Sequence, residues 1–307
     1  MDLAGASPSD MAAFFPSSVQ GLLADLAKGQ AILGQTSANL RHLGPGGTLR
    51  FGTRSVTVAG VVPDAVVGAH EVFVSRAEAE LLGVRAEQYV LVQAPGGLSQ
   101  ARLRAMLPSG TLMRVRGPGE AHFLRQADAV LPPVMMKAAF GEFAASPRLL
   151  PAQWMSIDPG WQSKHIVSAP VPILGTARCN AALIPQLRAA LDQVVSRGLA
   201  RLIKPGDYGG CFAARVIPGS VGEALSAHAW GAALDVNVSA NEVGASPHQD
   251  RRLVAIFKRW GFTWGGNWMR PDGMHFEFQC FPPALAPPSG LPASLTCPAG
   301  GAVWPST

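Results

Sequence analysis

The feature that most constrains the fold is the spacing of two ionisable residues in the second half of the chain. In the segment LSAHAWGAALDVN, His228 and Asp235 lie seven positions apart. A regular strand alternates its side chains with a period of two, so it would point these residues to opposite faces. Gly231 lies between them and supplies a permissive backbone. The sequence therefore predicts a bend near Gly231, followed by a strand over AALDVN that returns Asp235 toward His228.

A second segment, GGNWMRPDGMHFEFQ, ends in a short run with the alternation of a strand. The period of two places His275, Glu277 and Gln279 on one face of that strand. A hydrolytic zinc site needs about three nitrogen or oxygen ligands and one open position. His228, Asp235 and His275 can supply such a set if the bend brings the two segments together.

Two further charged residues suggest chemistry beside this ligand set. Asp272 precedes His275 by three positions and stands between a proline and a glycine, so a turn can hold its carboxylate near the metal without making it a ligand. That is the position of a general base, and a nearby cation would hold its pKa down. Arg215 is a permanent cation that can stabilise an oxyanion or bind a substrate carboxylate.

Each of these residues taken alone also has a structural explanation. An Asp-x-x-His or a His-x6-Asp spacing arises often by chance, and Arg215 alone is typical of a solvated surface group. Three tryptophans suit a core better than a substrate wall: Trp230, Trp264 and Trp268. Three polar residues can shape the site or serve the fold alone: Ser226, Asn237 and Glu242. The conjunction of the two segments, not any single residue, predicts the site.

The four cysteines indicate the redox compartment. They all lie in the second half of the chain and lack the C-x-x-C spacing of a zinc knuckle or redox motif. Two disulfides in an oxidising compartment are one interpretation, and four buried thiols in a cytosolic protein are the other. Three pairings are possible, and proximity in sequence favours Cys179 with Cys211 and Cys280 with Cys297.

The length of 307 residues predicts two domains. We expect an N-terminal helical segment over 1–45, with a helix over 22–33, and then a small α+β domain of unknown role over 46–150. Within that domain, strands are expected in LRFG, SVTVAGVV, EVFVS, QYVLVQ and TLMRVRG, and helices in RAEAELLG and LSQARLRAML. A connection over 145–172 leads to a third region, 151–307, with helices over 179–198 and 251–260, strands in FTW and MHFEFQ, and an irregular tail.

Composition excludes two classes of partner. The net charge is only +5, and no run of Lys or Arg exceeds two residues, so the chain lacks the basic stripe of a nucleic-acid-binding protein. No stretch approaches the roughly 18 apolar residues of a membrane span. The first residues show neither a basic n-region nor a continuous apolar region, so no export signal is visible.

The combined motif resembles a known enzyme family. The resemblance lies in Ser226-x-His228-x-x-Gly231-x-Ala233-x-Asp235, followed by Asp272-x-x-His275. This pattern is similar to the zinc signature of the D-alanyl-D-alanine carboxypeptidase and L-alanyl-D-glutamate endopeptidase family, which includes VanY-type enzymes and phage endolysins. Two neighbouring segments extend it: Gly210-Cys211-Phe212-x-x-Arg215 and Trp264-Gly265-Gly266-Asn267-Trp268. It covers roughly residues 170–280.

The resemblance implies a role for each matching residue. His228, Asp235 and His275 would bind Zn²⁺, Asp272 would activate the attacking water, and Arg215 would stabilise the oxyanion. We also assign Ser226 and Trp268 to substrate binding.

The same resemblance implies an α+β fold with an antiparallel sheet, shared with the hedgehog signalling domain. It also implies an extracytoplasmic zinc metallopeptidase, secreted or associated with the cell wall, that acts on peptidoglycan stem peptides as carboxypeptidase or endopeptidase. The alternative is a zinc-stabilised module that binds wall peptides or proteins without catalysis.

Overall fold

The computed structural model describes residues 1–84, 91, 97, 99–108, 130–149, 153–217, 224–268, 270–285, 291 and 295–298. It divides into two compact units, Met1–Arg125 and Gln126–Thr307, called unit 1 and unit 2 below. Both contain helices and strands, so the predicted α+β class is confirmed.

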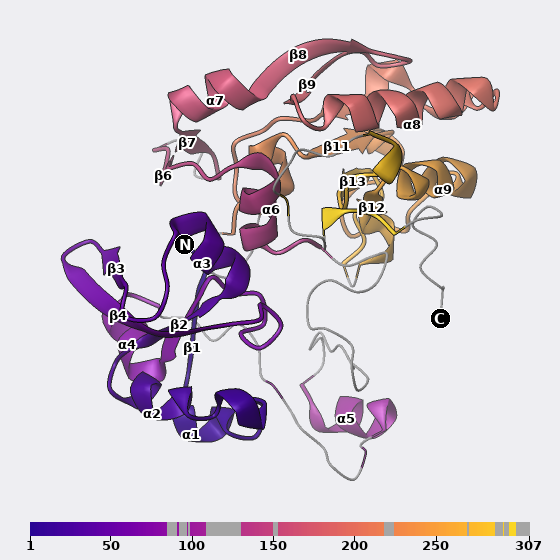
Figure 1. The fold of residues 1–307 in the computed structure, drawn as a ribbon. Coiled ribbons are helices and arrows are strands. Elements are labelled where there is room, and N and C mark those ends of the chain that lie inside the picture. Colours follow the sequence, from indigo (N-terminus) through magenta and orange to yellow (C-terminus); the bar gives the residue numbers. More distant parts are fainter. Residues whose placement is uncertain are drawn as a thin grey trace. The chain divides into compact units, whose positions relative to one another are not determined.

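Unit 1 is built on a five-stranded mixed sheet with the order β1-β5-β2-β4-β3 (Figure 1). Its strands are β1 (Leu3–Ala6), β2 (Ala31–Gly34), β3 (Thr48–Phe51), β4 (Arg54–Val62) and β5 (Val72–Ser75). Its helices are α1 (Pro8–Met11), α2 (Leu22–Ala27), α3 (Gln35–Arg41), α4 (Arg76–Leu81) and α5 (Gln100–Met106). The strands β3, β4 and β5 and the helices α4 and α5 lie where the sequence predicts them.

The first 45 residues differ from the prediction. The helical pattern over 22–33 continues only to Ala27, because Gly29 adopts a left-handed φ of +82° and the fully buried run AILG then forms β2. The strand β1 pairs with β5, and β2 pairs with β4 and β5. Residues 1–45 therefore complete the sheet of unit 1 across the predicted boundary at 45/46. The predicted strand TLMRVRG lies outside the described residues, and so does QYVLVQ apart from Leu91, which is in no strand.

Unit 2 contains an antiparallel sheet with the order β10-β11-β13-β12. These strands are β10 (Tyr208–Gly210), β11 (Ala233–Val236), β12 (Phe262–Trp264) and β13 (His275–Phe278). The predicted strands FTW and MHFEFQ are confirmed as β12 and β13. Helices α8 (Ile184–Ser196) and α9 (Arg251–Arg259) lie side by side (Figure 1). The ring of Phe257 on α9 packs 4.6 Å from that of Phe276 on β13, so the core lies under the sheet that carries His275.

The predicted connection over 145–172 is instead regular structure. Strands β6 (Ala145–Pro147) and β7 (Met155–Ile157) pair, and α7 (Pro159–His165) leads into the hairpin of β8 (Ile166–Val171) and β9 (Gly175–Asn180). The β6–β7 pair crosses the predicted boundary at 150/151. Helix α6 (Pro133–Phe140) also belongs to unit 2, because the ring of Phe140 lies 4.8 Å from that of Phe278. Proline and glycine in this region punctuate short elements and do not mark a linker.

Both disulfides are present in unit 2, Cys179 with Cys211 and Cys280 with Cys297. The first ties β9 to the segment that follows β10. The second ties the end of β13 to the C-terminal tail. Within the described part of the chain, no helix combines the length and apolar character that a membrane crossing requires.

Candidate metal centre

The bend predicted at Gly231 is what positions His228. A 3-10 helix over Ala227–Trp230 (η4) carries His228, and Gly231 ends it with a left-handed φ of +64°. A Cβ at Gly231 would lie 2.6 Å from the backbone nitrogen of Asn180, so a larger residue would collide with the end of β9. The buried hydroxyl of Ser226 accepts a hydrogen bond from the backbone N–H of His228. The chain therefore turns sharply into β11.

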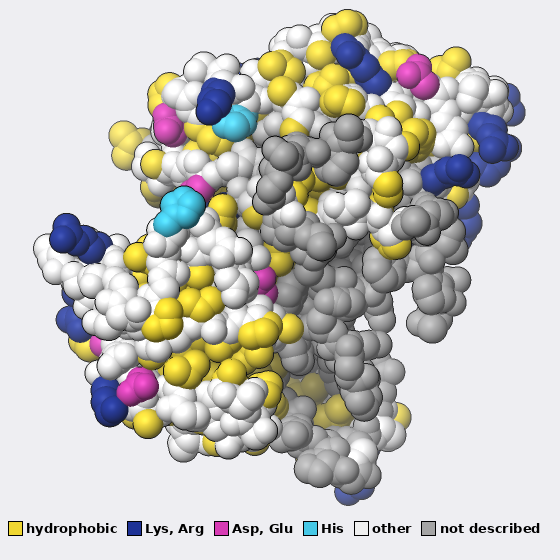
Figure 2. All heavy atoms as spheres, in the orientation of Figure 1, with side chains coloured by type: hydrophobic (Ala, Val, Ile, Leu, Met, Phe, Trp, Pro, Cys, Tyr) yellow, Lys and Arg dark blue, Asp and Glu magenta, His cyan; other side chains and the backbone are white. Residues whose placement is uncertain are grey.

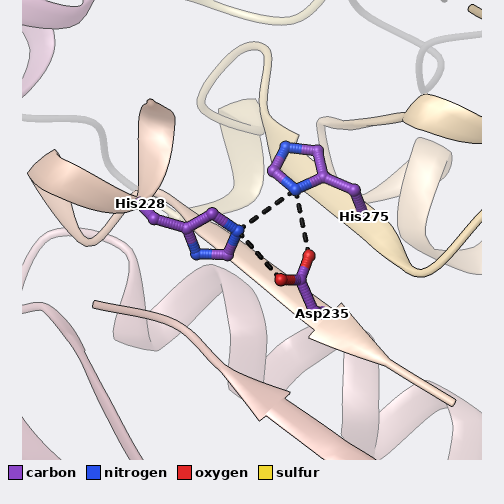
Figure 3. A group of neighbouring side chains, drawn as sticks. All are labelled: His228, Asp235 and His275. Atoms are coloured by element: carbon purple, nitrogen blue, oxygen red, sulfur yellow. Dashed lines mark hydrogen bonds and ion pairs between the residues drawn. The ribbon is translucent and has the colours of Figure 1, made fainter. Parts of the chain in front are cut away.

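Asp235 and His275 are brought together by strand register. They lie directly opposite each other on the antiparallel strands β11 and β13, so their side chains project from the same face of the sheet. His228 approaches that face from η4, and the three side chains point toward one another (Figure 3). One ligand atom from each residue lies within 4.8 Å of the other two.

The inner atoms of this cluster form a tight triangle. His228 Nε2 lies 3.2 Å from Asp235 Oδ2, and His275 Nδ1 lies 3.0 Å from Asp235 Oδ1. The two imidazole nitrogens are themselves 3.2 Å apart. Both histidines are buried, and the Asp235 side chain is 14% exposed. The predicted ligand set is thus assembled at one point.

The outer nitrogens of both imidazoles are already engaged. His228 Nδ1 donates to the carbonyl oxygen of Cys211 at 2.7 Å, and His275 Nε2 lies 3.0 Å from Glu277 Oε2. If each outer nitrogen carries its proton, the inner nitrogens present two lone pairs to each other, which repel unless a cation lies between them. Two imidazoles and one carboxylate are also a donor set that suits zinc. The residues present therefore fit the metal.

Without a metal, a proton on one imidazole can relieve the repulsion between the inner nitrogens. Burial lowers the pKa of His275, but the hydrogen bonds to Asp235 and Glu277 outweigh burial and raise the pKa to about 10. Burial likewise raises the pKa of Asp235, but the hydrogen bonds from His228 and His275 outweigh it and hold the pKa well below its usual range. The metal-free cluster therefore holds a cationic His275 against an ionised Asp235 at neutral pH.

Asp272 lies beside the cluster without joining the triangle. Its backbone carbonyl accepts from the N–H of His275, and its N–H donates to Gly265, so the turn before β13 holds it in place. Burial raises the pKa of Asp272, and the charges of His275 and Arg215 act against that rise. Its buried Oδ1 has no hydrogen-bond partner among the described residues.

The other predicted residues surround this arrangement. Arg215 is half-buried, and its carbonyl accepts the N–H of Ser226. The ring of Trp268 lies 5.3 Å from that of His275. Asn237 instead ties the backbone of Leu202 and Lys204 to Gln249, and Glu242 is exposed. Roles for Arg215, Ser226 and Trp268 remain predictions.

Sequence reasoning missed three partners of the cluster. Glu277 was placed on the face of His275, but its contact with Nε2 was not predicted; the spacing of two residues on one strand was the available signal. The second partner is the Cys211 carbonyl. Every residue has a backbone carbonyl, so the residue type does not predict this contact. Tyr208 is the third, since burial and then the charge of Asp235 raise the pKa of its phenol to about 12.

Comparison with known proteins agrees with this geometry. Residues 220–278 match the sequence profile of a family described as D-alanyl-D-alanine carboxypeptidase. The resemblance predicted for the C-terminal part of the chain is confirmed, and it supports a peptidase. The matched range contains His228, Asp235, Asp272 and His275 and lies entirely within unit 2. No curated protein and no solved structure matches the chain.

Proposed function

We propose that unit 2 is an extracytoplasmic zinc peptidase that hydrolyses an amide bond of peptidoglycan stem peptides, as a D-Ala-D-Ala carboxypeptidase or an L-Ala-D-Glu endopeptidase. The observation that carries the proposal is the convergence of His228, Asp235 and His275 with both outer imidazole nitrogens engaged. The family match over 220–278 supports the substrate class. We further propose the hedgehog-like arrangement for this unit.

His228 Nε2, His275 Nδ1 and the Asp235 carboxylate would hold the metal. Zinc bound there supplies a Lewis acid that polarises the scissile carbonyl and acidifies water. The contacts from the Cys211 carbonyl and Glu277 fix the tautomers and orient both rings. Both imidazole rings would therefore be oriented before the metal binds.

Asp272 moves the proton. Its unpartnered Oδ1 accepts the proton of the attacking water as the new C–O bond forms, and then delivers it to the amine nitrogen as the C–N bond breaks. Burial raises the pKa of this carboxyl, which makes it a better base than an exposed aspartate. Arg215 lies close enough for its charge to lower the pKa of Asp272, and it would stabilise the oxyanion.

Two disulfides support the extracytoplasmic location, because such bonds persist in oxidising compartments.

The test is incubation of the zinc-loaded full chain with the synthetic peptide L-Ala-D-Glu-Lys-D-Ala-D-Ala, followed by mass spectrometry. We expect cleavage of one bond, abolished by a chelator and restored by zinc. The fragment masses distinguish carboxypeptidase from endopeptidase. A zinc-loaded chain that binds the peptide without cutting it, with Asp272→Asn binding equally well, would favour the non-catalytic module.

A further inference from the structure

A pocket of about 410 Å³ opens on unit 2 beside the β6–β7 hairpin. Its walls include the aromatic residues Trp154 and Phe212, the amide of Gln162, and two arginines, Arg148 and Arg178. None of the described residues that line it is acidic. The pocket therefore combines an apolar wall with uncompensated positive charge.

Both guanidinium groups are available to a ligand. Arg178 stacks on Phe212, with the guanidinium carbon 4.6 Å from the ring centroid. Stacking uses the face of the guanidinium and leaves its in-plane N–H donors free. Among the described residues, neither Arg148 nor Arg178 has a carboxylate partner, whereas Arg252 of the same unit pairs with Asp250.

One backbone segment, 211–215, contacts both the pocket and His228 of the candidate metal centre. The segment 211–215 supplies Phe212 to the pocket and ends at Arg215, which forms a β-bridge with Trp154. The same segment holds His228 twice, through the Cys211 carbonyl and through the Ala213 N–H, which donates to the His228 carbonyl at 3.0 Å. The pocket and the candidate metal centre are therefore connected through one short stretch of backbone.

We propose that this pocket binds a carboxylate of the peptide substrate remote from the bond that is cut, with Arg148 and Arg178 as its donors. The inference rests on the proposed function and names the substrate feature that the enzyme selects. The planar forks of two arginines match a carboxylate in geometry and charge. When the bond between the two D-Ala residues is cut, the remote carboxylate of the stem peptide is that of D-Glu, and Trp154 and Phe212 would cover the neighbouring aliphatic carbons.

The experiment compares two peptides that differ only at this group. One is L-Ala-D-Glu-Lys-D-Ala-D-Ala, and the other carries an amide in place of the free D-Glu carboxylate. For the wild-type chain we expect kcat/KM to be about tenfold higher with the free carboxylate, the scale of a charge-assisted hydrogen bond. In Arg178→Ala and Arg148→Ala this ratio should fall toward one, mainly through KM.

Two further variants control for charge and folding. The control position is Arg197, which is exposed just beyond α8 and does not line the pocket. Figure 2 shows Lys and Arg side chains gathered on the part of unit 2 where α8 and α9 lie. Arg197→Ala removes the same charge away from the pocket and should keep the tenfold ratio. Arg178→Lys keeps the charge but loses the planar fork, so an intermediate ratio is expected. Circular dichroism verifies that each variant is folded.

Binding supplies a readout that does not depend on turnover. Calorimetric titration of zinc-loaded Asp272→Asn with both peptides should give about tenfold tighter binding of the free carboxylate, lost when Arg178→Ala is added. If the wild type cuts both peptides equally well, or Arg178→Ala keeps the full ratio, the pocket assignment is wrong and the peptidase stands. If nothing is cut but the arginines still determine binding, the peptidase is wrong and the pocket stands.

Discussion

The two units treat their buried polar groups differently. In unit 1, Glu71 is fully buried, pairs with Arg41 and accepts from the N–H of Asp2. Asp64 accepts both the N–H and the hydroxyl of Thr36. Among the described residues, the buried side-chain polar atoms that lack any partner all lie in unit 2.

Four of those unpartnered atoms lie near the candidate metal ligands: Tyr208 Oη, Trp268 Nε1, Asp272 Oδ1 and Glu277 Oε1. A buried polar atom without a partner costs about 1–3 kcal/mol, so natural folds rarely retain several in one place. Unit 1 thus pairs the buried polar groups described above, whereas unit 2 leaves several without a protein partner beside the candidate metal centre, as the proposed chemistry would require.

The largest effect is expected from the ligands themselves. His228→Ala and His275→Ala should each abolish retention of about one zinc per chain and reduce hydrolysis to background, because only two ligands remain. Asp235→Ala should weaken zinc retention, because it removes the carboxylate ligand and leaves the two imidazoles. Elemental analysis and peptide cleavage measure the two losses. His42→Asn changes an exposed histidine of unit 1 and should retain both; zinc bound equally by His228→Ala would contradict the site.

Asp272→Asn should separate chemistry from metal binding. The variant keeps all three ligands, so zinc content and fold should stay close to wild type, while kcat falls by about 10²-fold or more through loss of the proton acceptor. Single-turnover cleavage with parallel zinc analysis tests both halves. Loss of zinc from this variant would show that Asp272 is a ligand and not a base.

Glu277→Gln should lower zinc affinity by about 10- to 100-fold, because the contact that fixes the His275 tautomer loses its charge. Competition with a chelator of known affinity measures the change. The matched control is Glu242→Gln, which removes the same charge from an exposed position. Equal zinc affinities in the two variants would show that the charge of Glu277 does not support zinc binding.

The metal-free chain should become less stable as the pH rises. His275 has its pKa raised to about 10 in the folded state, against about 6.5 in the unfolded chain. The protonated form thus stabilises the fold fully below pH 6.5, and this contribution is lost as the pH rises through about 10. Thermal denaturation with a chelator from pH 6 to 10.5 should show a falling Tm, and zinc should flatten the curve. A flat metal-free curve would refute the assignment.

The smallest effect on catalysis should come from unit 1. Glu71→Gln breaks a buried ion pair and should destabilise unit 1 by about 3–5 kcal/mol. Zinc content and hydrolysis at low temperature should not change, because the metal ligands all belong to unit 2. Denaturant unfolding and cleavage assays measure the two properties. A matching loss of zinc would erase the contrast between the units.

Local sequence features predicted the parts of the site that depend on local geometry. The odd spacing of His228 and Asp235 required a bend, and Gly231 supplied it with a positive φ. The alternation in MHFEFQ placed His275 and Glu277 on one face of β13. These results follow from backbone periodicity, which one segment carries by itself.

Features that depend on distant pairing were not predictable in the same way. The parallel pairing of β1 with β5 joins segments about 70 residues apart. The apolar run of β2 is short, so in the sequence alone it continues the helical pattern over 22–33. The pocket wall around Arg178 and Phe212 also depends on β9 meeting the segment after β10. Sequence periodicity carries no information about such meetings.

The disulfide between Cys179 and Cys211 has a consequence for the order in which the protein matures. The carbonyl that orients His228 belongs to Cys211, so the bond anchors one outer contact of the metal site to β9. Closing a loop of 32 residues removes roughly 3–4 kcal/mol of chain entropy from the unfolded state. In the proposed zinc enzyme, oxidation before metal loading would present the ion with a preformed coordination shell. A chain kept reduced would have to organise that shell at the expense of its affinity for the metal.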